Sequence, residues 1–196
     1  MSFHFAYRKR FIDLNEQEIL ALAISSEEDD ARIYRNYAEH LRTDFPSSAT
    51  IFEGMAVEED DHRKQLIDLH KTRFGDVIPL IRREHVSGFF NRRPVWLMEN
   101  LGIERIRAEA EMMEGSAQRF YEAAARRTTD ADTRKLLGTL AAAVAQHVGK
   151  ADDLTGQHLD ADAIDQEART AHRQFVLSWV QPCLAGLMDG SVSTLA

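Results

Sequence analysis

The sequence predicts an all-α protein: a four-helix bundle with a long crossover and a C-terminal extension helix. Alanine, glutamate, leucine and arginine dominate long stretches of the chain, and these residue types favour helices. Proline and glycine are scarce, with 4 and 10 residues in a chain of 196. Apolar residues recur at steps of three and four, which is the spacing of the buried stripe of an amphipathic helix.

The composition limits the classes of function. A chain of 196 residues is long enough for one sizeable domain with an appendage. The formal net charge of −8 argues against a nucleic-acid partner, because phosphate binding needs a concentrated basic surface. The single cysteine, Cys183, excludes an intrachain disulfide and fits a reducing compartment. We expect neither a signal peptide nor a complete membrane span, because no long apolar run is present.

Turn-forming residues mark the ends of five expected helices. Asn15, followed by acidic residues, caps the first helix. Pro46 separates the first helix from the second, because proline disfavours helix at the preceding residue. Gly75 ends the second helix as a C-cap, and residues 128–130 break the chain between the third and fourth. The expected helices cover residues 16–44, 48–73, 94–127, 130–159 and 162–180.

Residues 75–94 form the least regular part of the sequence, because glycine and proline interrupt them repeatedly. About twenty residues is long for a tight turn between neighbouring helices. The segment therefore either crosses the length of the bundle, which makes the second and third helices parallel, or carries the second half of the chain to another subunit.

The second helix contains one Glu-x-x-His segment, Glu59 and His62, whose side chains share one helix face. Apolar residues continue this face in both directions: Phe52, Met55, Leu66 and Leu69. A carboxylate and an imidazole thus stand where leucine or isoleucine is expected. Buried carboxylates are paired or bind metal, so the segment is a candidate metal site. The alternative is a solvated acidic face, because Glu58, Asp60 and Asp61 surround the pair.

Residues of the ligand type recur on the stripes of the other three helices. Glu28 stands on the stripe of the first helix, while Glu111 and Glu114 are three apart on the third, with Glu111 nearer the edge. His147 lies on the core side of the fourth helix. Each has a structural alternative: Glu28 could be an exposed acid among other acids, and His147 a hydrogen-bonded core histidine.

The two halves of the chain resemble each other. Glu28 and Glu114 are each followed by alanine at the third position, an aromatic residue at the sixth and alanine at the tenth. Glu59 follows Glu28 by 31 residues, and His147 follows Glu114 by 33. The fourth-helix counterpart of the Glu-x-x-His pair is then Val144 and His147. Bundles with this inventory of carboxylates and imidazoles hold two iron or manganese ions between facing helices.

This arrangement resembles the ferritin-like superfamily, and within it the rubrerythrin branch. The resemblance rests on the segments that begin at Glu28, Glu59 and Glu111, which are similar to the motifs of the first, second and third rubrerythrin helices. It implies a ferritin-like dimetal bundle over residues 1–160 that binds iron, two ions in an intact site, with manganese as the alternative. The metal ligands that it implies are Glu28, Glu59, His62, Glu111, Glu114 and His147.

The C-terminal part is similar to the membrane-bound ferritin A family, in which a rubrerythrin-like domain is fused to a vacuolar-iron-transporter-like membrane domain. Residues 171–175 and 186–195 resemble the junction and the opening of that membrane domain. The resemblance implies a connecting helix over 161–182 and the start of a transporter domain at 183–196. It also implies a homodimer on the cytoplasmic side of the inner membrane that supports iron export and resistance to iron and peroxide stress.

One residue departs from the family pattern. Val144 stands where the family has a bridging glutamate, and valine cannot coordinate a metal ion. Weakened or single-metal occupancy is one consequence, and a metal-depleted module for dimerisation or regulation is the alternative. Ferroxidase or peroxidase activity is a further alternative. A self-contained peroxidase is disfavoured, because rubrerythrins usually carry Cys-x-x-Cys pairs that supply electrons, whereas Cys183 is alone here.

Overall fold

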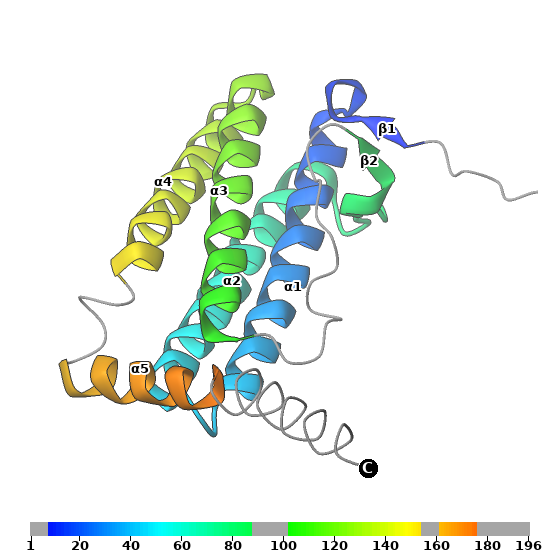
Figure 1. The fold of residues 1–196 in the computed structure, drawn as a ribbon. Coiled ribbons are helices and arrows are strands. Elements are labelled where there is room, and N and C mark those ends of the chain that lie inside the picture. The colour runs from blue at the N-terminus through cyan, green and yellow to red at the C-terminus, as the bar shows by residue number, and fades with distance from the viewer. Residues whose placement is uncertain (1–7, 88–101, 154–160, 176–196) are drawn as a thin grey trace, which may run out of the picture.

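A computed structural model describes residues 8–87, 102–153 and 161–175, without the side chains of 147–153, 161 and 175. Five helices make up most of this part of the chain (Figure 1). They are α1 (Glu16–Leu41), α2 (Pro46–Phe74), α3 (Ile103–Arg127), α4 (Ala131–Asp153) and α5 (Ala161–Phe175). Short elements accompany them: strand β1 (Lys9–Arg10), the 3-10 turns η1 (Phe11–Asp13) and η2 (Arg83–His85), and strand β2 (Val86–Ser87). The all-α prediction is confirmed.

The four long helices form two antiparallel hairpins, α1 with α2 and α3 with α4 (Figure 1). In Figure 1, α2 and α3 run in the same direction, so the chain returns along the length of the bundle before α3 begins. The parallel direction of α2 and α3 agrees with the predicted crossover, of which residues 88–101 lie outside the described part of the chain. Among the described elements, α1 faces α3 and α2 faces α4. α5 lies across the end of the bundle at which α1 ends (Figure 1).

Local sequence sets most helix ends. Asn15 and Glu18 form a reciprocal capping box at the start of α1, with the side chain of Asn15 accepting from the backbone of Glu18 at 2.9 Å. Gly75 ends α2 with φ of 84°, a conformation that glycine adopts without strain. The third helix is shorter than predicted. Gly102 has an extended backbone just before α3, so a continuous helix from Pro94 is excluded.

The first part of the crossover, residues 76–87, lies along α1, and we call it the crossover strap. The hydroxyl of Ser25 donates to the backbone oxygen of Ile81 at 2.7 Å. At its far end, β2 pairs with β1 in parallel, with Lys9 opposite Val86. Val86 is buried in the core, whereas Val77 and Leu80 are each 80% exposed. The hydrogen bond from Ser25 and the pairing of β2 with β1 therefore hold the strap against the bundle.

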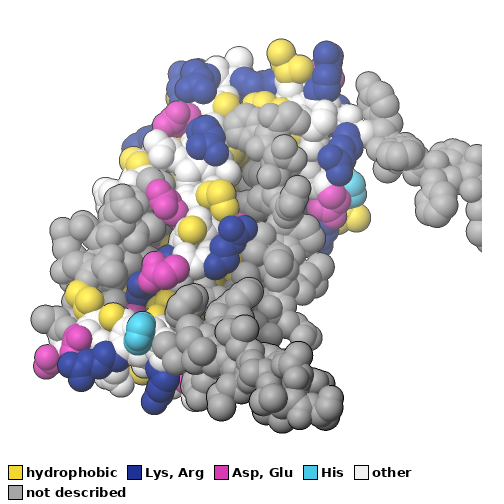
Figure 2. All heavy atoms as spheres, viewed as in Figure 1, with side chains coloured by type: hydrophobic (Ala, Val, Ile, Leu, Met, Phe, Trp, Pro, Cys, Tyr) yellow, Lys and Arg dark blue, Asp and Glu magenta, His cyan; other side chains and the backbone are white. Residues whose placement is uncertain are grey.

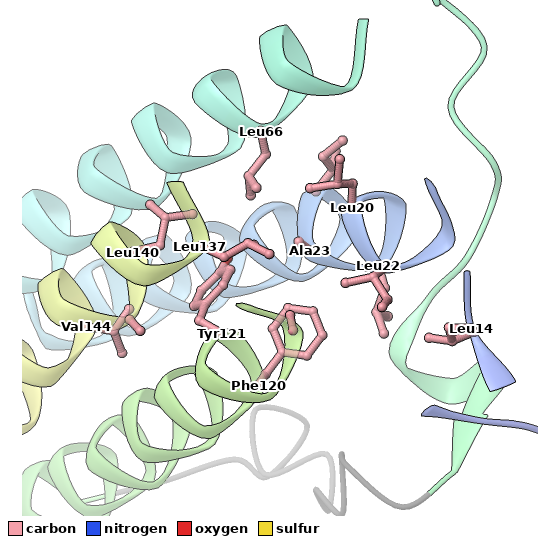
Figure 3. Packing of buried hydrophobic residues seen from close by; sticks show 14 of the residues in the cluster. Leu14, Leu20, Leu22, Ala23, Leu66, Phe120, Tyr121, Leu137, Leu140 and Val144 are labelled. Atoms are coloured by element: carbon pink, nitrogen blue, oxygen red, sulfur yellow. The ribbon is translucent and has the colours of Figure 1, made fainter. Parts of the chain in front are cut away.

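Two apolar clusters fill the bundle, one toward each end. One gathers the start of α1, the end of α2, the end of α3 and the start of α4, and Figure 3 shows its side chains meeting between the helices. The other gathers the remaining halves of α1, α2 and α3. Between these clusters, along α1, α2 and α3, stand buried acidic residues: Glu27, Glu59 and Glu114. The candidate site is thus placed in the middle of the core.

The buried carboxylate of Glu167 connects α5 to the bundle through hydrogen bonds and an ion pair. Phe45, the residue before α2, provides no side-chain cap, and Glu167 of α5 supplies one instead. Glu167 accepts from the backbone amide of Ser48 at 3.1 Å and from its hydroxyl at 3.0 Å. Arg107 of α3 pairs with the same carboxylate at 2.6 Å. An acid from another helix thus satisfies the start of α2, which carries a partial positive charge.

The described surface is mixed in charge. Figure 2 shows Lys and Arg interspersed with Asp and Glu over the described side chains on this face. Within residues 8–87, 102–153 and 161–175, no helix combines the length and the apolar character needed to cross a membrane. The predicted junction at 171–175 forms the end of α5, whereas the predicted start of a transporter domain, residues 183–196, lies outside the described residues.

Candidate metal centre

Three buried side chains from α1 and α2 converge in the middle of the bundle. Glu27, Glu59 and His62 each offer a ligand atom, and these atoms all lie within 4.8 Å of one another. The Nδ1 atom of His62 is 3.1 Å from Oε2 of Glu59 and 3.7 Å from Oε2 of Glu27. All three residues are less than 9% exposed. The cluster therefore holds two carboxyls and an imidazole with little access to water.

Helix geometry explains the convergence. Glu59 and His62 are three residues apart on α2 and project from one face, between Met55 and Leu66, which are also buried. This confirms the predicted stripe and excludes the solvated acidic face for these two residues. Glu27 meets them from α1, the antiparallel partner of α2 in the hairpin.

Two tyrosines link α1 and α3 across the site. Tyr121 of α3 donates its hydroxyl hydrogen to Oε1 of Glu27, and Tyr34 of α1 donates to Oε1 of Glu114 at 2.5 Å. Each tyrosine is seven residues after the glutamate on its own helix, and each bonds to the glutamate of the other helix. Both hydroxyls are buried, so each fixes one carboxylate oxygen in place.

The electrostatics favour a bound proton or a bound cation. Burial raises the pKa of Glu27 to about 7. Burial, followed by the neighbouring charge of Glu27, raises the pKa of Glu59 well above its usual range. Nearby Glu114 acts in the same direction on both groups. Carboxyls whose pKa is raised in this way hold protons that a divalent cation can displace.

Glu28 does not belong to this cluster. Its side chain is half-buried and pairs with Arg63 at 3.3 Å, whereas Glu27 is 3% exposed. The prediction that Glu28 stands on the buried stripe is therefore wrong by one residue. Glu27 and Glu28 are adjacent on α1. The prediction of Glu28 relied on the spacing of the alanine and aromatic residues that follow it, and this spacing indicated the wrong glutamate.

The remaining predicted residues divide between core and surface. Glu114 is 1% exposed and joins the site through Tyr34, whereas Glu111 is exposed on the outer side of α3. His147 lies on α4, but its side chain is outside the described part of the chain. The predicted asymmetry between Glu111 at the edge and Glu114 inside agrees with this placement.

Val144 occupies a true core position. It is 1% exposed on α4 and packs in the same cluster as Tyr121 and Leu140 (Figure 3). The α4 position that corresponds to Glu59 is therefore filled by hydrocarbon. The described part of the site is acidic on the α1, α2 and α3 sides and apolar at this point of α4.

A different repeat in the sequence would have identified Glu27. The interval from Glu27 to Tyr34 equals the interval from Glu114 to Tyr121. A glutamate and a tyrosine seven apart lie two turns apart on one face, so each pair can meet its counterpart across the bundle. The glutamate and tyrosine repeat was thus present in the sequence, but the prediction was based on the alanine spacing instead.

The donor set fits a divalent transition-metal ion. Oε2 of Glu27 is buried and accepts no hydrogen bond, which is costly unless a cation or proton satisfies it. In zinc sites, nitrogen and oxygen ligands lie about 2.0–2.2 Å from the ion, so two ligand atoms of one ion are at most about 4.4 Å apart. Ligand atoms within 4.8 Å of one another therefore need only small adjustments to close around one ion. Imidazole and carboxylate together suit iron and manganese.

The helix order, the crossover and the buried acids define a ferritin-like bundle with a carboxylate metal site. Comparison with protein families agrees: the model of the family described as Rubrerythrin matches residues 18–155, from α1 to α4. The match covers more than half of the chain, which therefore belongs to the rubrerythrin family. Membership in this family implies iron binding, and the Glu27, Glu59 and His62 cluster is a group that could hold a metal ion. No curated protein and no solved structure matches the chain.

Proposed function

We propose that this protein binds ferrous iron between α1 and α2, with Glu27, Glu59 and His62 as its first ligands. The observation that carries the proposal is the convergence of three buried ligand atoms within 4.8 Å. The proposed ligand set keeps Glu59, His62, Glu114 and His147 from the sequence motif. It replaces Glu28 with Glu27 and leaves out Glu111, which is exposed on α3.

Each residue has a distinct role in the proposal. Glu59 and His62 bind from one helix face, and the tyrosine hydroxyl on Glu27 leaves its other oxygen, Oε2, for the ion. A bound iron supplies redox chemistry with dioxygen or peroxide when it is present. The chain itself supplies a dry, acidic pocket that releases protons as the ion enters. Because Val144 provides no bridging oxygen, we propose that the first ion binds tightly and a second binds weakly.

We further propose a setting for this site: the cytoplasmic side of the inner membrane, in a homodimer whose bundle serves a membrane-embedded iron transporter. The support is the resemblance of residues 171–175 and 186–195 to the junction and opening of such a domain. In this setting the bundle binds iron before export and contributes to resistance against iron and peroxide stress.

A second candidate function follows from Val144. A bundle whose α4 position is apolar could have lost its metal and act as a dimerisation or regulatory module. The two proposals differ in a simple observable. A metal-binding bundle is stabilised by RT ln(1 + [L]/Kd), about 2.7 kcal/mol at a hundredfold excess over Kd, whereas a metal-free module is not.

The test is anaerobic thermal unfolding with and without Fe(II), followed by iron analysis after loose metal is removed. We expect an upward shift of several degrees and about one tightly held ion per chain. Glu59→Gln provides the control, because it keeps the shape of the side chain and weakens the ligand. An unchanged melting temperature with no retained iron would sink the metal-binding proposal and leave the metal-free module.

A further inference from the structure

Arg83, on the crossover strap, makes several hydrogen bonds to the turn of α1 that carries Glu27. Its Nε atom donates to the hydroxyl of Ser26 at 3.1 Å, and its Nη2 atom donates to the backbone oxygen of Ser26 at 3.0 Å. The same guanidinium donates to both carboxylate oxygens of Asp30, one of them at 2.8 Å. These contacts span residues 26 to 30, and Glu27 lies between them.

The contacts of Arg83 with Ser26 and Asp30 are buried, and they depend on the shape of the guanidinium group. The side chains of Arg83 and Asp30 are 12% and 7% exposed, so the pair is largely removed from water. A guanidinium presents its donors in a planar fork that matches a carboxylate, whereas a lysine ammonium is a point charge. The contacts with Ser26 and Asp30 thus fix the rotation of this turn of α1 as well as its distance from the strap.

We infer that Arg83 is a positioning residue for the metal site, acting on Glu27 through Ser26 and Asp30. The inference rests on the proposed iron site. A small rotation of α1 at this turn moves Glu27 away from Glu59 and His62, because a side chain extends well beyond the helix axis. The strap therefore has a function beyond linking the two hairpins: it sets the geometry of a ligand on a neighbouring helix.

The adjacent residue supplies a matched control. Arg82 is also on the strap and also pairs with α1, to Asp29 at 3.5 Å. That pair is more exposed, at 35% and 23%, and it makes one contact at the outer side of the helix. The same substitution at Arg82 and at Arg83 therefore changes one strap arginine in each case. Arg83 makes several buried contacts with the turn around Glu27, whereas Arg82 makes one longer contact that is more exposed.

The experiment measures Fe(II) affinity anaerobically, by competition with a coloured chelator, for the full chain and for Arg83→Lys and Arg82→Lys. Each measurement is made at a temperature at which circular dichroism shows the metal-free variant to be folded. Partners outside the ligand set typically contribute 10- to 100-fold to metal affinity. We expect Arg83→Lys to weaken binding by about tenfold or more, and Arg82→Lys by less than about threefold.

The outcomes separate the two proposals. Equal affinities for the two lysine variants, with iron bound by the unaltered chain, would overturn the role of Arg83 and leave the iron site standing. No iron binding by the unaltered chain would overturn both. If Arg83→Lys does not fold, the double variant Asp30→Asn with Arg83→Met removes both buried charges and serves instead. Unaltered affinity in that variant would also overturn the inference.

Discussion

The two hairpins of this bundle offer the candidate site very different surfaces. From α1 and α2 come Glu27, Glu59 and His62, which together form a compact ligand cluster. From α3 and α4 come the buried acid Glu114 and the apolar side chain of Val144. The hairpins nonetheless share their length, their antiparallel pairing and the glutamate and tyrosine seven residues apart.

The difference between the hairpins shows which residues the fold requires for packing and which ones a metal site requires for binding. Tyr34 and Tyr121 bond across the bundle to Glu114 and Glu27, so both hairpins keep the contacts that hold the buried acids in place. At position 144 the fold accepts valine, because a core helix position is satisfied by hydrocarbon. A metal site requires oxygen or nitrogen there. The α1 and α2 side is therefore where we expect the tighter ion.

The largest expected effect comes from making the two hairpins alike with Val144→Glu. Without metal, this change places a further carboxyl in the core and should cost about 3 kcal/mol or more, roughly 6–12 °C in melting temperature. With Fe(II), the second ion should bind more tightly. Thermal unfolding and iron analysis with and without Fe(II) measure both effects.

Val144→Gln is the matched control, because it adds similar bulk without the charge. We expect it to lower stability without raising the iron content. If the glutamate variant holds no more iron than the unaltered chain, position 144 does not face the site.

The second expected effect is a pH dependence of the stability of the metal-free protein, which arises from the buried acids of α1 and α2. Glu27 keeps its proton up to about pH 7 in the folded protein, compared with an ordinary pKa of 4.5. Between these pH values the folded state binds more protons than the unfolded state, so stability without metal falls as pH rises. The loss amounts to about 3 kcal/mol from Glu27, and Glu59 acts in the same direction.

Urea unfolding of the metal-free protein at pH 5 and pH 7 measures this slope. Glu27→Gln should reduce it, because the glutamine does not titrate. Bound Fe(II) should reverse it, since the ion competes with protons and affinity falls toward pH 5 as the carboxyls bind protons. A metal-free stability that rises from pH 5 to pH 7 would contradict the buried, protonated cluster.

A smaller effect distinguishes the two tyrosines. Tyr121→Phe removes the hydrogen bond that Tyr121 donates to Glu27, and Tyr34→Phe removes the one that Tyr34 donates to Glu114. Each change leaves a buried acceptor with one donor fewer and should cost about 1–3 kcal/mol of stability. Only Tyr121→Phe should also weaken iron binding strongly. Equal losses of affinity in chelator competition would mean that the two hairpins contribute equally to the first site.

The smallest expected effect lies outside both ligand surfaces. Glu167→Gln weakens the contact of α5 with Ser48 and Arg107 while keeping the shape of the side chain. We expect a loss of about 1–3 kcal/mol of stability, with iron affinity unchanged when both proteins are folded. A marked fall in affinity would show that α5 influences the site, and the comparison between hairpins would then be incomplete.

The sequence predicted the frame of this protein well, because local rules determine it. Apolar spacing located the helices, Asn15 and Gly75 marked ends, and the buried stripe placed Glu59 and His62 correctly. The choice between Glu27 and Glu28 was not determined locally. Adjacent positions on a helix differ by about 100° in direction, and the partner that selects Glu27, Tyr121, lies 94 residues away.

Long-range polar contacts also escaped prediction. Arg83 lies in the irregular segment 75–94, and the sequence does not indicate that it is buried against Asp30. Glu167 likewise caps α2 by accepting a hydrogen bond from Ser48, which lies 119 residues earlier in the chain. Such contacts depend on how elements pack, and helix periodicity carries no information about them.

The most direct test of the iron site counts iron per chain after anaerobic loading with Fe(II), in the unaltered protein, Glu27→Gln and Glu28→Gln. The two variants remove the same charge from adjacent residues, one in the cluster and one paired with Arg63 on the outside. We predict that the unaltered chain and Glu28→Gln each retain at least about one iron, and that Glu27→Gln loses it. Retention by Glu27→Gln together with loss by Glu28→Gln would contradict the site described here.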